Sequence, residues 1–248
     1  MKTVLLLGGT SDALQLAKKL LKFKALHLIY SVAGLVRQPQ LNCTIHSGGF
    51  QGNMAHYLHQ QQIDFVIDAT HPYASNMSQT AYKATQTRSL PYWQYERPAW
   101  KASHSDHWIS FQDWDTLHPQ LSAYKKPFFA WGREVLQHLD EIPKHQHWLI
   151  RTASHTAIQH PQVCFIQAIG GFSLQTETQL YQQYGFDVLI CKNSGGQAVA
   201  HKLQLARQLH LPVLMQDRPA SFALQTRFYD LNILLEALQS TLNLSARH

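Results

Sequence analysis

Cysteines, runs of basic residues and long apolar segments are all scarce in this 248-residue sequence. Its three cysteines, Cys43, Cys164 and Cys191, form no CxxC pair, so the sequence predicts free thiols in a reducing compartment. No run of Lys and Arg exceeds two residues, which argues against a nucleic-acid partner. Near the start, only four consecutive apolar residues (4–7) precede the glycines, too few for a signal peptide or a membrane span. We therefore expect a cytoplasmic protein that binds neither membranes nor nucleic acid.

Several signatures of catalysis are missing as well. The sequence contains no Walker A phosphate loop, no GxSxG nucleophile motif and no Tyr-x-x-x-Lys pair. The last absence argues against a short-chain dehydrogenase or a sugar epimerase. The histidine-rich stretches 103–108 and 144–148 offer no third ligand at metal-binding spacing, so we interpret them as surface histidines and expect no metal.

The overall composition is that of a globular protein, with 45% hydrophobic and 15% charged residues. The formal net charge is +6, with sixteen histidines besides. Such a surplus is explained either by a solvated basic surface or by a polyanionic ligand, such as a phosphate-bearing cofactor or a polycarboxylate.

Short apolar runs alternate with amphipathic stretches along most of the chain, which predicts βα units on parallel sheets. The expected strands are 3–7, 26–31, 43–46, 65–69, 91–95, 107–111, 127–132, 147–151, 163–168, 187–191 and 212–216. Helices are expected after the first strand and at 75–86, 173–184, 197–209 and 230–242. A polar, aperiodic stretch at 96–105 is typical of a linker. The sequence thus predicts an α/β protein of two Rossmann-like doubly wound domains, 1–98 and 106–248, with an interdomain cleft.

A weak internal repeat supports two similar halves. Residues 64–98 and 187–219 each contain a strand that starts with Asp, a helix, Leu-Pro, a second strand and a final Arg-Pro. Chance can produce so short a match, but the shared order of elements favours duplication.

The stretch LLLGGTSDA (5–13) carries the first motif with chemical meaning. Gly8 and Gly9 end a strand, and Thr10 and Ser11 offer hydroxyl groups where a helix starts. Glycines allow a phosphate to approach the backbone, and the N–H groups of a helix N-terminus complement its charge. The motif is not a full GxGxxG, and a tight βα turn with a capped helix is the alternative.

The end of the second strand bears on the choice of dinucleotide. NAD-binding units place a carboxylate about twenty residues beyond the glycines, and here Tyr30 and Ser31 occupy that position. Ser31 and Arg37 could bind a 2′-phosphate, which favours NADP over NAD, although Arg37 could equally be a surface residue. HSGGF (46–50) supplies a second glycine pair suited to close backbone approach.

The stretch DATHPYA (68–74) places polar residues directly after a buried strand. Ligands of parallel sheets gather at the carboxyl ends of strands, where Thr70 and His71 fall. Pro72 fixes its own φ and biases His71 towards extended geometry, so we expect the imidazole to have a defined direction. A capping threonine and a packed histidine are the alternative interpretation.

The second half repeats this arrangement with positive charges. CKNSGG (191–196) follows a strand and offers Lys192 as a cation, Ser194 as a donor, and Gly195 and Gly196 as an oxyanion nest. Two arginines, Arg133 and Arg151, also follow or end strands. Together the three cations predict a pocket for carboxylates or phosphates.

These motifs, in this order, resemble the precorrin-6A reductase family of cobalamin biosynthesis, which includes cobalt-precorrin-6A members. The resemblance covers nearly the whole chain, and its most specific elements are DATHPYA and the Lys-x-Ser-Gly segment. It implies two Rossmann-like domains, NADPH on the first (NADH is possible), and hydride transfer to one double bond of a tetrapyrrole polycarboxylate.

The resemblance also implies roles for individual residues. The implied cofactor-binding residues are Gly8, Gly9, Thr10, Ser11, Ser31, Ala33, Gly34, Arg37, Gly48, Gly49, Phe50, Ala69, Thr70, His71, Pro72 and Tyr73. The residues expected to bind the substrate, from their positions at strand ends and from the substrate class that the resemblance implies, are Arg133, Arg151, Lys192, Ser194, Gly195 and Gly196. His71 and Lys192 are the candidate proton donors, with solvent or the substrate's own carboxylates as alternatives.

Two departures from the family pattern stand near these residues. Leu35 occupies a position that is often Arg, for which Arg37 could substitute, and Asn193 replaces a usual aspartate, so Lys192 lacks an expected acidic neighbour. Other functions stay open: a reductase of another polycarboxylate, or a non-catalytic nucleotide- or metabolite-binding regulator. We expect a monomer or a weak homo-oligomer, and the sequence leaves open whether the macrocycle contains cobalt.

Overall fold

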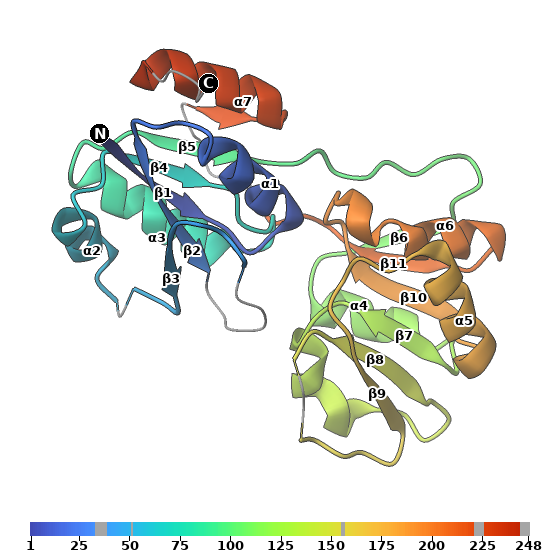
Figure 1. Ribbon diagram of the computed structural model, residues 1–248. Helices are drawn as coiled ribbons and strands as arrows, with labels where there is room; N and C mark the ends of the chain where they lie inside the picture. Colours follow the sequence, from blue (N-terminus) through green and yellow to red (C-terminus); the bar gives the residue numbers. More distant parts are fainter. Residues whose placement is uncertain (33–38, 51, 155–156, 221–225, 244–248) are drawn as a thin grey trace. The chain divides into compact units, whose positions relative to one another are not determined.

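The computed structural model describes residues 1–32, 39–50, 52–154, 157–220 and 226–243. The chain forms two compact units (Figure 1). The first unit consists of Met1–Pro98 together with Pro219–His248, and the second consists of Ala99–Arg218. The cleft that the sequence predicts between the domains stays a prediction.

The first unit is built on a six-stranded sheet in which all strands are parallel. In spatial order its strands are β12 (Arg227–Phe228), β5 (Tyr92–Tyr95), β4 (Phe65–Asp68), β1 (Lys2–Leu7), β2 (Leu26–Val32) and β3 (Thr44–Ser47). Its helices are α1 (Ser11–Leu20), α2 (Met54–Gln60), α3 (Ser75–Gln86) and α7 (Leu231–Leu242). The sheet therefore has the strand order of a dinucleotide-binding Rossmann fold, with its sixth strand supplied by the end of the chain.

The apolar residues of β1 alternate between two hydrophobic layers. In the first unit, α1 and α7 lie on one side of the sheet and α2 and α3 on the other (Figure 1). Val4 and Leu6 pack with residues of α1 and α7, whereas Leu5 and Leu7 pack with residues of α2 and α3. A strand that is covered on both faces needs apolar side chains at every position, which is why β1 reads as an unbroken apolar run.

The second unit has a parallel six-stranded sheet of the same kind. Its strands in spatial order are β6 (Trp108–Phe111), β11 (Val213–Gln216), β10 (Val188–Lys192), β7 (Pro127–Ala130), β8 (Trp148–Thr152) and β9 (Val163–Gln167). α4 (Trp114–Leu121) and the 3₁₀ helix η1 (Glu134–Glu141) cover one face. α5 (Leu174–Tyr184) and α6 (His201–Gln208) cover the other, after a short 3₁₀ turn, η2 (Gln197–Val199). The predicted α/β class with two parallel, doubly wound sheets is confirmed.

The predicted repeat corresponds to equivalent parts of the two sheets. Residues 64–98 form β4, α3 and β5, and residues 187–219 form β10, α6 and β11, which occupy the same places in the strand order. Both repeats end in Arg-Pro, and both of these ends coincide with a passage of the chain from one unit to the other.

The predicted second domain, 106–248, is wrong in its last thirty or so residues, because residues from Pro219 onward belong to the first unit. β12 pairs with β5, and Leu234 and Leu238 of α7 pack in the same core as Leu16 and Leu20 of α1. This return buries an apolar helix face that would otherwise be exposed to water. The predicted helix at 197–209 is divided into η2 and α6. α4 and η1 lie between strands of the second half, where helical stretches are expected without defined bounds, and α2 lies in a stretch where the sequence predicts no helix.

Within the described ranges, no helix combines the length and the apolar character needed to cross a membrane.

Candidate functional site

The carboxyl ends of β1, β2, β3 and β4 lie together at one edge of the first sheet, since these strands are parallel neighbours. The segments that leave this edge contain Gly8–Ser11 after β1, Gly48–Phe50 after β3 and Ala69–Tyr73 after β4. Most of the cofactor-binding residues predicted from the sequence are thus brought to one edge. Ala33, Gly34 and Arg37 follow β2 and lie outside the described residues.

Hydrogen bonds from the backbone and from Thr10 fix the turn between β1 and α1. The amide of Gly8 donates to the carbonyl of Ser31 at 2.8 Å, and that of Gly9 donates to the Tyr30 hydroxyl at 3.1 Å. Thr10 caps α1 by accepting a hydrogen bond from the amide of Ala13 at 3.1 Å. The turn is therefore well defined by the protein's own contacts.

The glycines at this edge differ in what surrounds them. A Cβ at Gly8 would lie 2.3 Å from the Tyr30 ring, so Gly8 is needed for packing against a tyrosine of this chain. At Gly9, Gly48 and Gly49 a Cβ would have no neighbour within 4 Å among the described atoms. These three positions leave the backbone open, as a phosphate group requires.

A buried carboxylate organises the segment after β4. Asp68 accepts hydrogen bonds from the amide of Thr70 at 2.9 Å, from the Thr70 hydroxyl at 2.7 Å and from the Tyr92 hydroxyl at 2.6 Å. Burial, and then the charge of Asp68, raise the pKa of Tyr92 well above its ordinary value, so its hydroxyl stays protonated as a donor. Thr70 therefore shapes this turn, and Asp68 and Tyr92 are supporting residues that the sequence interpretation missed.

His71 has a defined orientation at the start of α3. Its Nδ1 accepts a hydrogen bond from the amide of Tyr73 at 3.4 Å, and its carbonyl accepts one from the amide of Ala74 at 2.7 Å. A neutral imidazole that accepts at Nδ1 carries its proton on Nε2. Ala74, the N-cap of α3, provides no side-chain acceptor, so the first turn of this helix has no side-chain cap.

Near the end of β3, an aromatic cluster holds a histidine that the sequence interpretation missed. His46 stacks on Phe50 with ring centroids 4.7 Å apart and contacts Tyr57 at 4.5 Å. Its buried Nε2 atom has no hydrogen-bond partner among the described residues. Ser31, on the neighbouring strand, is buried as well, with 5% of its surface exposed. His46 is therefore a buried polar residue that precedes the open glycines Gly48 and Gly49 in the sequence.

In the second unit, Lys192 at the end of β10 forms an ion pair with Glu134 at the start of η1. A Cβ at Gly132 would lie 2.6 Å from the Glu134 carboxylate and 3.6 Å from the Lys192 amine, so this glycine leaves room for the pair. The acidic neighbour that Asn193 does not provide thus comes from a different strand end. The expectation that Lys192 lacks such a neighbour is wrong.

The other two predicted cations have different surroundings. Arg133, in the same turn as Glu134, donates to the Ser154 hydroxyl at 2.6 Å and is exposed. Arg151 donates two hydrogen bonds to Glu177 of α5, at 3.0 and 3.1 Å. Arg133 and Lys192 therefore share one strand-end region, whereas Arg151 is directed to the helix layer on the α5 side.

The turn after β10 contains the remaining predicted substrate-binding residues. The amide of Ser194 donates to the carbonyl of Lys192 at 2.8 Å, and Ser194 is 6% exposed. Gly195 has φ = +71°, a conformation that favours glycine, and Gly196 precedes η2. The chain therefore turns sharply beside Lys192.

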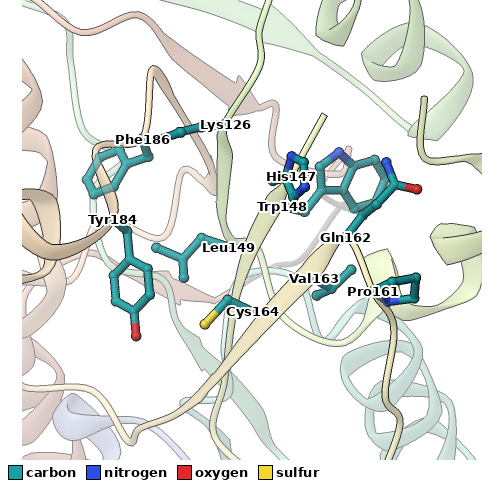
Figure 2. Close-up of a pocket in the computed structure, with 10 residues that line it drawn as sticks. All are labelled: Lys126, His147, Trp148, Leu149, Pro161, Gln162, Val163, Cys164, Tyr184 and Phe186. Atoms are coloured by element: carbon teal, nitrogen blue, oxygen red, sulfur yellow. The ribbon is translucent and has the colours of Figure 1, made fainter. Parts of the chain in front are cut away.

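A cavity of about 230 Å³ lies in the second unit. It is at the opposite end of the strands from Lys192 and the turn after β10. Figure 2 shows Trp148 and Gln162 at one end of it and Tyr184 and Phe186 at the other. Its residues precede or begin β7, β8, β9 and β10, so it belongs to the amino edge of the sheet, opposite to Lys192. Among the described residues, no three His, Cys, Asp or Glu side chains are grouped to hold a metal ion.

Comparison with known proteins gives consistent results. The chain matches the family described as Precorrin-6x reductase CbiJ/CobK over residues 3–239. It is 33% identical over 226 residues to the Precorrin-6A reductase of Rhodococcus erythropolis, covering 88% of this chain and 90% of that protein. It is 29% identical over 197 residues to the Cobalt-precorrin-6A reductase of Methanococcus maripaludis, covering 76% of this chain and 79% of that protein. The solved structure of CobK precorrin-6A reductase superimposes with a TM-score of 0.88 at 31% identity, over 97% of both chains.

Proposed function

Because this chain belongs to the precorrin-6x reductase family, we propose that it reduces one double bond of the precorrin-6A macrocycle with NADPH as reductant. The observation that carries this proposal is the match over residues 3–239, which spans both units. The first unit then binds the dinucleotide, and the second contributes to the tetrapyrrole site.

The carboxyl edge of the first sheet fits a dinucleotide phosphate. Gly9, Gly48 and Gly49 leave open backbone, and α3 begins without a side-chain cap, so N–H groups are available for an anion. In this proposal Gly8, Thr10 and Ser11 form the wall of the pyrophosphate site. Bound NADPH supplies a hydride, and saturation of the double bond also takes up one proton.

The choice of NADPH over NADH rests on the end of β2. Ser31 stands where NAD-binding units place a carboxylate, and the nearby Arg37 is a candidate partner of a 2′-phosphate. A carboxylate there would repel that phosphate, and none is present in the sequence from Ser31 to Arg37.

A macrocycle that bears many carboxylates suits the basic strand ends of the second unit. Arg133 follows β7 and Lys192 ends the neighbouring strand β10, and Ser194, Gly195 and Gly196 form the turn after β10. Arg151 is not among the proposed contacts, because its guanidinium makes two hydrogen bonds to Glu177 and both side chains are buried.

Two residues are candidates for the proton donor. His71 carries a proton on Nε2 when neutral, since its Nδ1 accepts from the Tyr73 amide. Lys192 ends β10 among the proposed substrate contacts, where it forms an ion pair with Glu134. His71 also lies among the proposed cofactor contacts, so in this proposal it holds the edge of the site whether it or Lys192 supplies the proton.

The test is NADPH oxidation by the purified protein with anaerobically prepared precorrin-6A and, in parallel, its cobalt form. We expect one of the two macrocycles to accelerate oxidation, with a higher kcat/KM for NADPH than for NADH. Binding of NADPH without acceleration by either macrocycle would overturn the reductase proposal and favour a nucleotide-binding regulator. Acceleration by another polycarboxylate alone would reassign the substrate.

A further inference from the structure

Asn193 hydrogen-bonds to two segments of the second unit. One contains Trp100, just after the chain enters the unit, and the other contains Arg218, just before the chain leaves it. The chain enters after Pro98 and leaves before Pro219, so residues near 100 and 218 lead into and out of the second unit. Asn193 directly follows Lys192, the last residue of β10, and hydrogen-bonds to both segments.

The side chain of Asn193 holds the first segment at Trp100. Its Oδ1 accepts a hydrogen bond from the Trp100 amide at 2.8 Å, and its Nδ2 donates to the Trp100 carbonyl at 3.1 Å. The carboxamide therefore pairs with both backbone groups of one residue. An aspartate could accept the first bond but could not donate the second, and an alanine could form neither.

A second contact fixes the Trp100 side chain. The Lys202 amine lies 5.2 Å from the centroid of the Trp100 ring and donates to the carbonyl of Val199 at 3.0 Å. Lys202 is 7% exposed, so this cation–π contact is largely shielded from water. Trp100 is thus held at its backbone by Asn193 and at its ring by α6.

The backbone of Asn193 holds the second segment. Its amide donates to the carbonyl of Gln216 at 3.3 Å, and its carbonyl accepts from Nε of Arg218 at 2.9 Å. Gln216 ends β11 and Arg218 is the last residue of the second unit. One residue therefore joins the incoming segment, the outgoing segment and the end of β10.

We propose that Asn193 is a positioning residue that anchors both inter-unit segments beside Lys192 and thereby holds Lys192 in its ion pair with Glu134. The catalytic part of this inference rests on the proposed function, in which Lys192 contacts the substrate. The structural part, that Asn193 anchors the two segments and holds the ion pair of Lys192, is independent of the proposed function, because it concerns contacts within the second unit alone.

Two substitutions of Asn193 distinguish its two side-chain hydrogen bonds to Trp100, and a substitution elsewhere serves as the control. Asn193→Ala removes both side-chain bonds to Trp100, whereas Asn193→Asp keeps the acceptor for the Trp100 amide. Gln162→Ala is the matched control, because the Gln162 amide donates to the carbonyls of Pro143 and Gln146, both at 2.8 Å, at the opposite edge of the same sheet. It loses two hydrogen bonds to backbone carbonyls without touching the proposed site.

The first readout is hydrogen exchange at the Trp100 amide, which requires no enzyme activity. We expect exchange to accelerate about tenfold in Asn193→Ala, which corresponds to about 1.4 kcal/mol for the lost hydrogen bond, and to stay slow in Asn193→Asp and Gln162→Ala. The second readout is the Cε resonance of Lys192 by NMR. In Asn193→Ala it should move toward its position in Glu134→Gln, in which the ion pair is broken.

The third readout separates kcat from KM. Asn193→Ala should lower kcat about tenfold with little change in the KM for the dinucleotide, Asn193→Asp should recover part of kcat, and Gln162→Ala should match wild type. Unchanged Trp100 exchange, or an unchanged Lys192 resonance, in Asn193→Ala would overturn the positioning role. If Asn193→Ala changes both the Trp100 exchange rate and the Lys192 resonance but keeps a wild-type kcat, the catalytic part of the proposal is overturned. If wild type itself reduces no macrocycle, the proposed function fails, and the exchange and NMR results still decide the anchoring role.

Discussion

The guanidinium of Arg151 and the carboxylate of Glu177 form a two-bond ion pair, with N–O distances of 3.0 and 3.1 Å. The side chain of Glu177 is 1% exposed and that of Arg151 is 9% exposed, and the guanidinium carbon lies 4.0 Å from the centroid of the Phe172 ring. The pair joins β8 to α5 inside the second unit. This surrounding favours a structural role for an arginine that the sequence predicts to bind substrate.

Glu177→Ala should destabilise the protein by about 3–5 kcal/mol, because it leaves the Arg151 charge buried without its partner. Urea-induced unfolding measures the loss. The double variant Arg151→Met/Glu177→Leu should regain most of the stability, since apolar side chains of similar size replace the whole pair. Its KM for the macrocycle should equal that of wild type. A clear rise in that KM would instead support the predicted contact between Arg151 and the substrate.

Tyr92→Phe should cost about 1–3 kcal/mol of stability, because it removes a donor from the buried carboxylate of Asp68. Thermal unfolding of both proteins measures the difference. The substitution should also lower kcat, since Asp68 holds the turn that leads to His71. In an Asp68→Asn background the same change should cost less, and an equal cost there would contradict the proposed pairing.

Asp106 should make stability depend on pH. Burial opposes ionisation, but hydrogen bonds from Arg207 and Ser103 outweigh it and hold the pKa of Asp106 below its ordinary value of 3.8. A carboxyl group with a lowered native pKa stabilises the fold above its ordinary pKa, and this stabilisation is lost as the pH falls through the native pKa.

Asp106→Asn should therefore be less stable than wild type near neutral pH, by on the order of 1 kcal/mol because Arg207 is partly exposed. The difference between the two proteins should shrink as the pH falls below about 4. Urea unfolding across this pH range tests both statements. A difference that does not change with pH would show that packing, and not the charge, accounts for the loss.

The sheets could be predicted from the sequence because strands covered on both faces are continuous apolar runs. The run at 65–69 contains β4 (Phe65–Asp68), and the predicted helix at 75–86 coincides with α3 (Ser75–Gln86). The positions of Thr70 and His71 after β4 follow from the same pattern, since a parallel sheet puts all its carboxyl ends at one edge.

Contacts between distant residues could not be predicted in this way. Glu134 and Lys192 are 58 positions apart, and no local pattern pairs them. β12 contains only two residues, Arg227 and Phe228, which are too few to show a periodic pattern. The sequence therefore gives no local indication that the chain returns to the first unit. The sequence also predicts a phosphate contact at Gly8. In the structure, the group nearest to a Cβ added at Gly8 is the ring of Tyr30.

The glycines after β1 and β3 should respond differently to a methyl group. Gly8→Ala should destabilise the protein by about 1–3 kcal/mol, because its Cβ would overlap the Tyr30 ring at 2.3 Å. Gly49→Ala has no such neighbour and should leave stability unchanged, since no atom lies within 4 Å of the added Cβ. If the dinucleotide approaches this backbone, Gly49→Ala should raise the KM for NADPH severalfold. If Gly49→Ala has wild-type stability and a wild-type KM for NADPH, the phosphates of NADPH do not bind beside Gly49.

Thr10 joins the two segments that form the proposed cofactor site. Its hydroxyl donates to the carbonyl of Ala69 at 2.9 Å while accepting from the Ala13 amide at 3.1 Å, so it fastens the β1–α1 turn to the segment that leads to His71. Thr10→Val keeps the side-chain shape but removes both bonds, and it should cost about 1–2 kcal/mol and raise the KM for NADPH. Thr10→Ser keeps the hydroxyl and should resemble wild type in urea unfolding and in steady-state kinetics. If Thr10→Val loses stability but binds NADPH normally, the hydroxyl serves the fold alone, and the alignment of the two segments does not determine cofactor affinity.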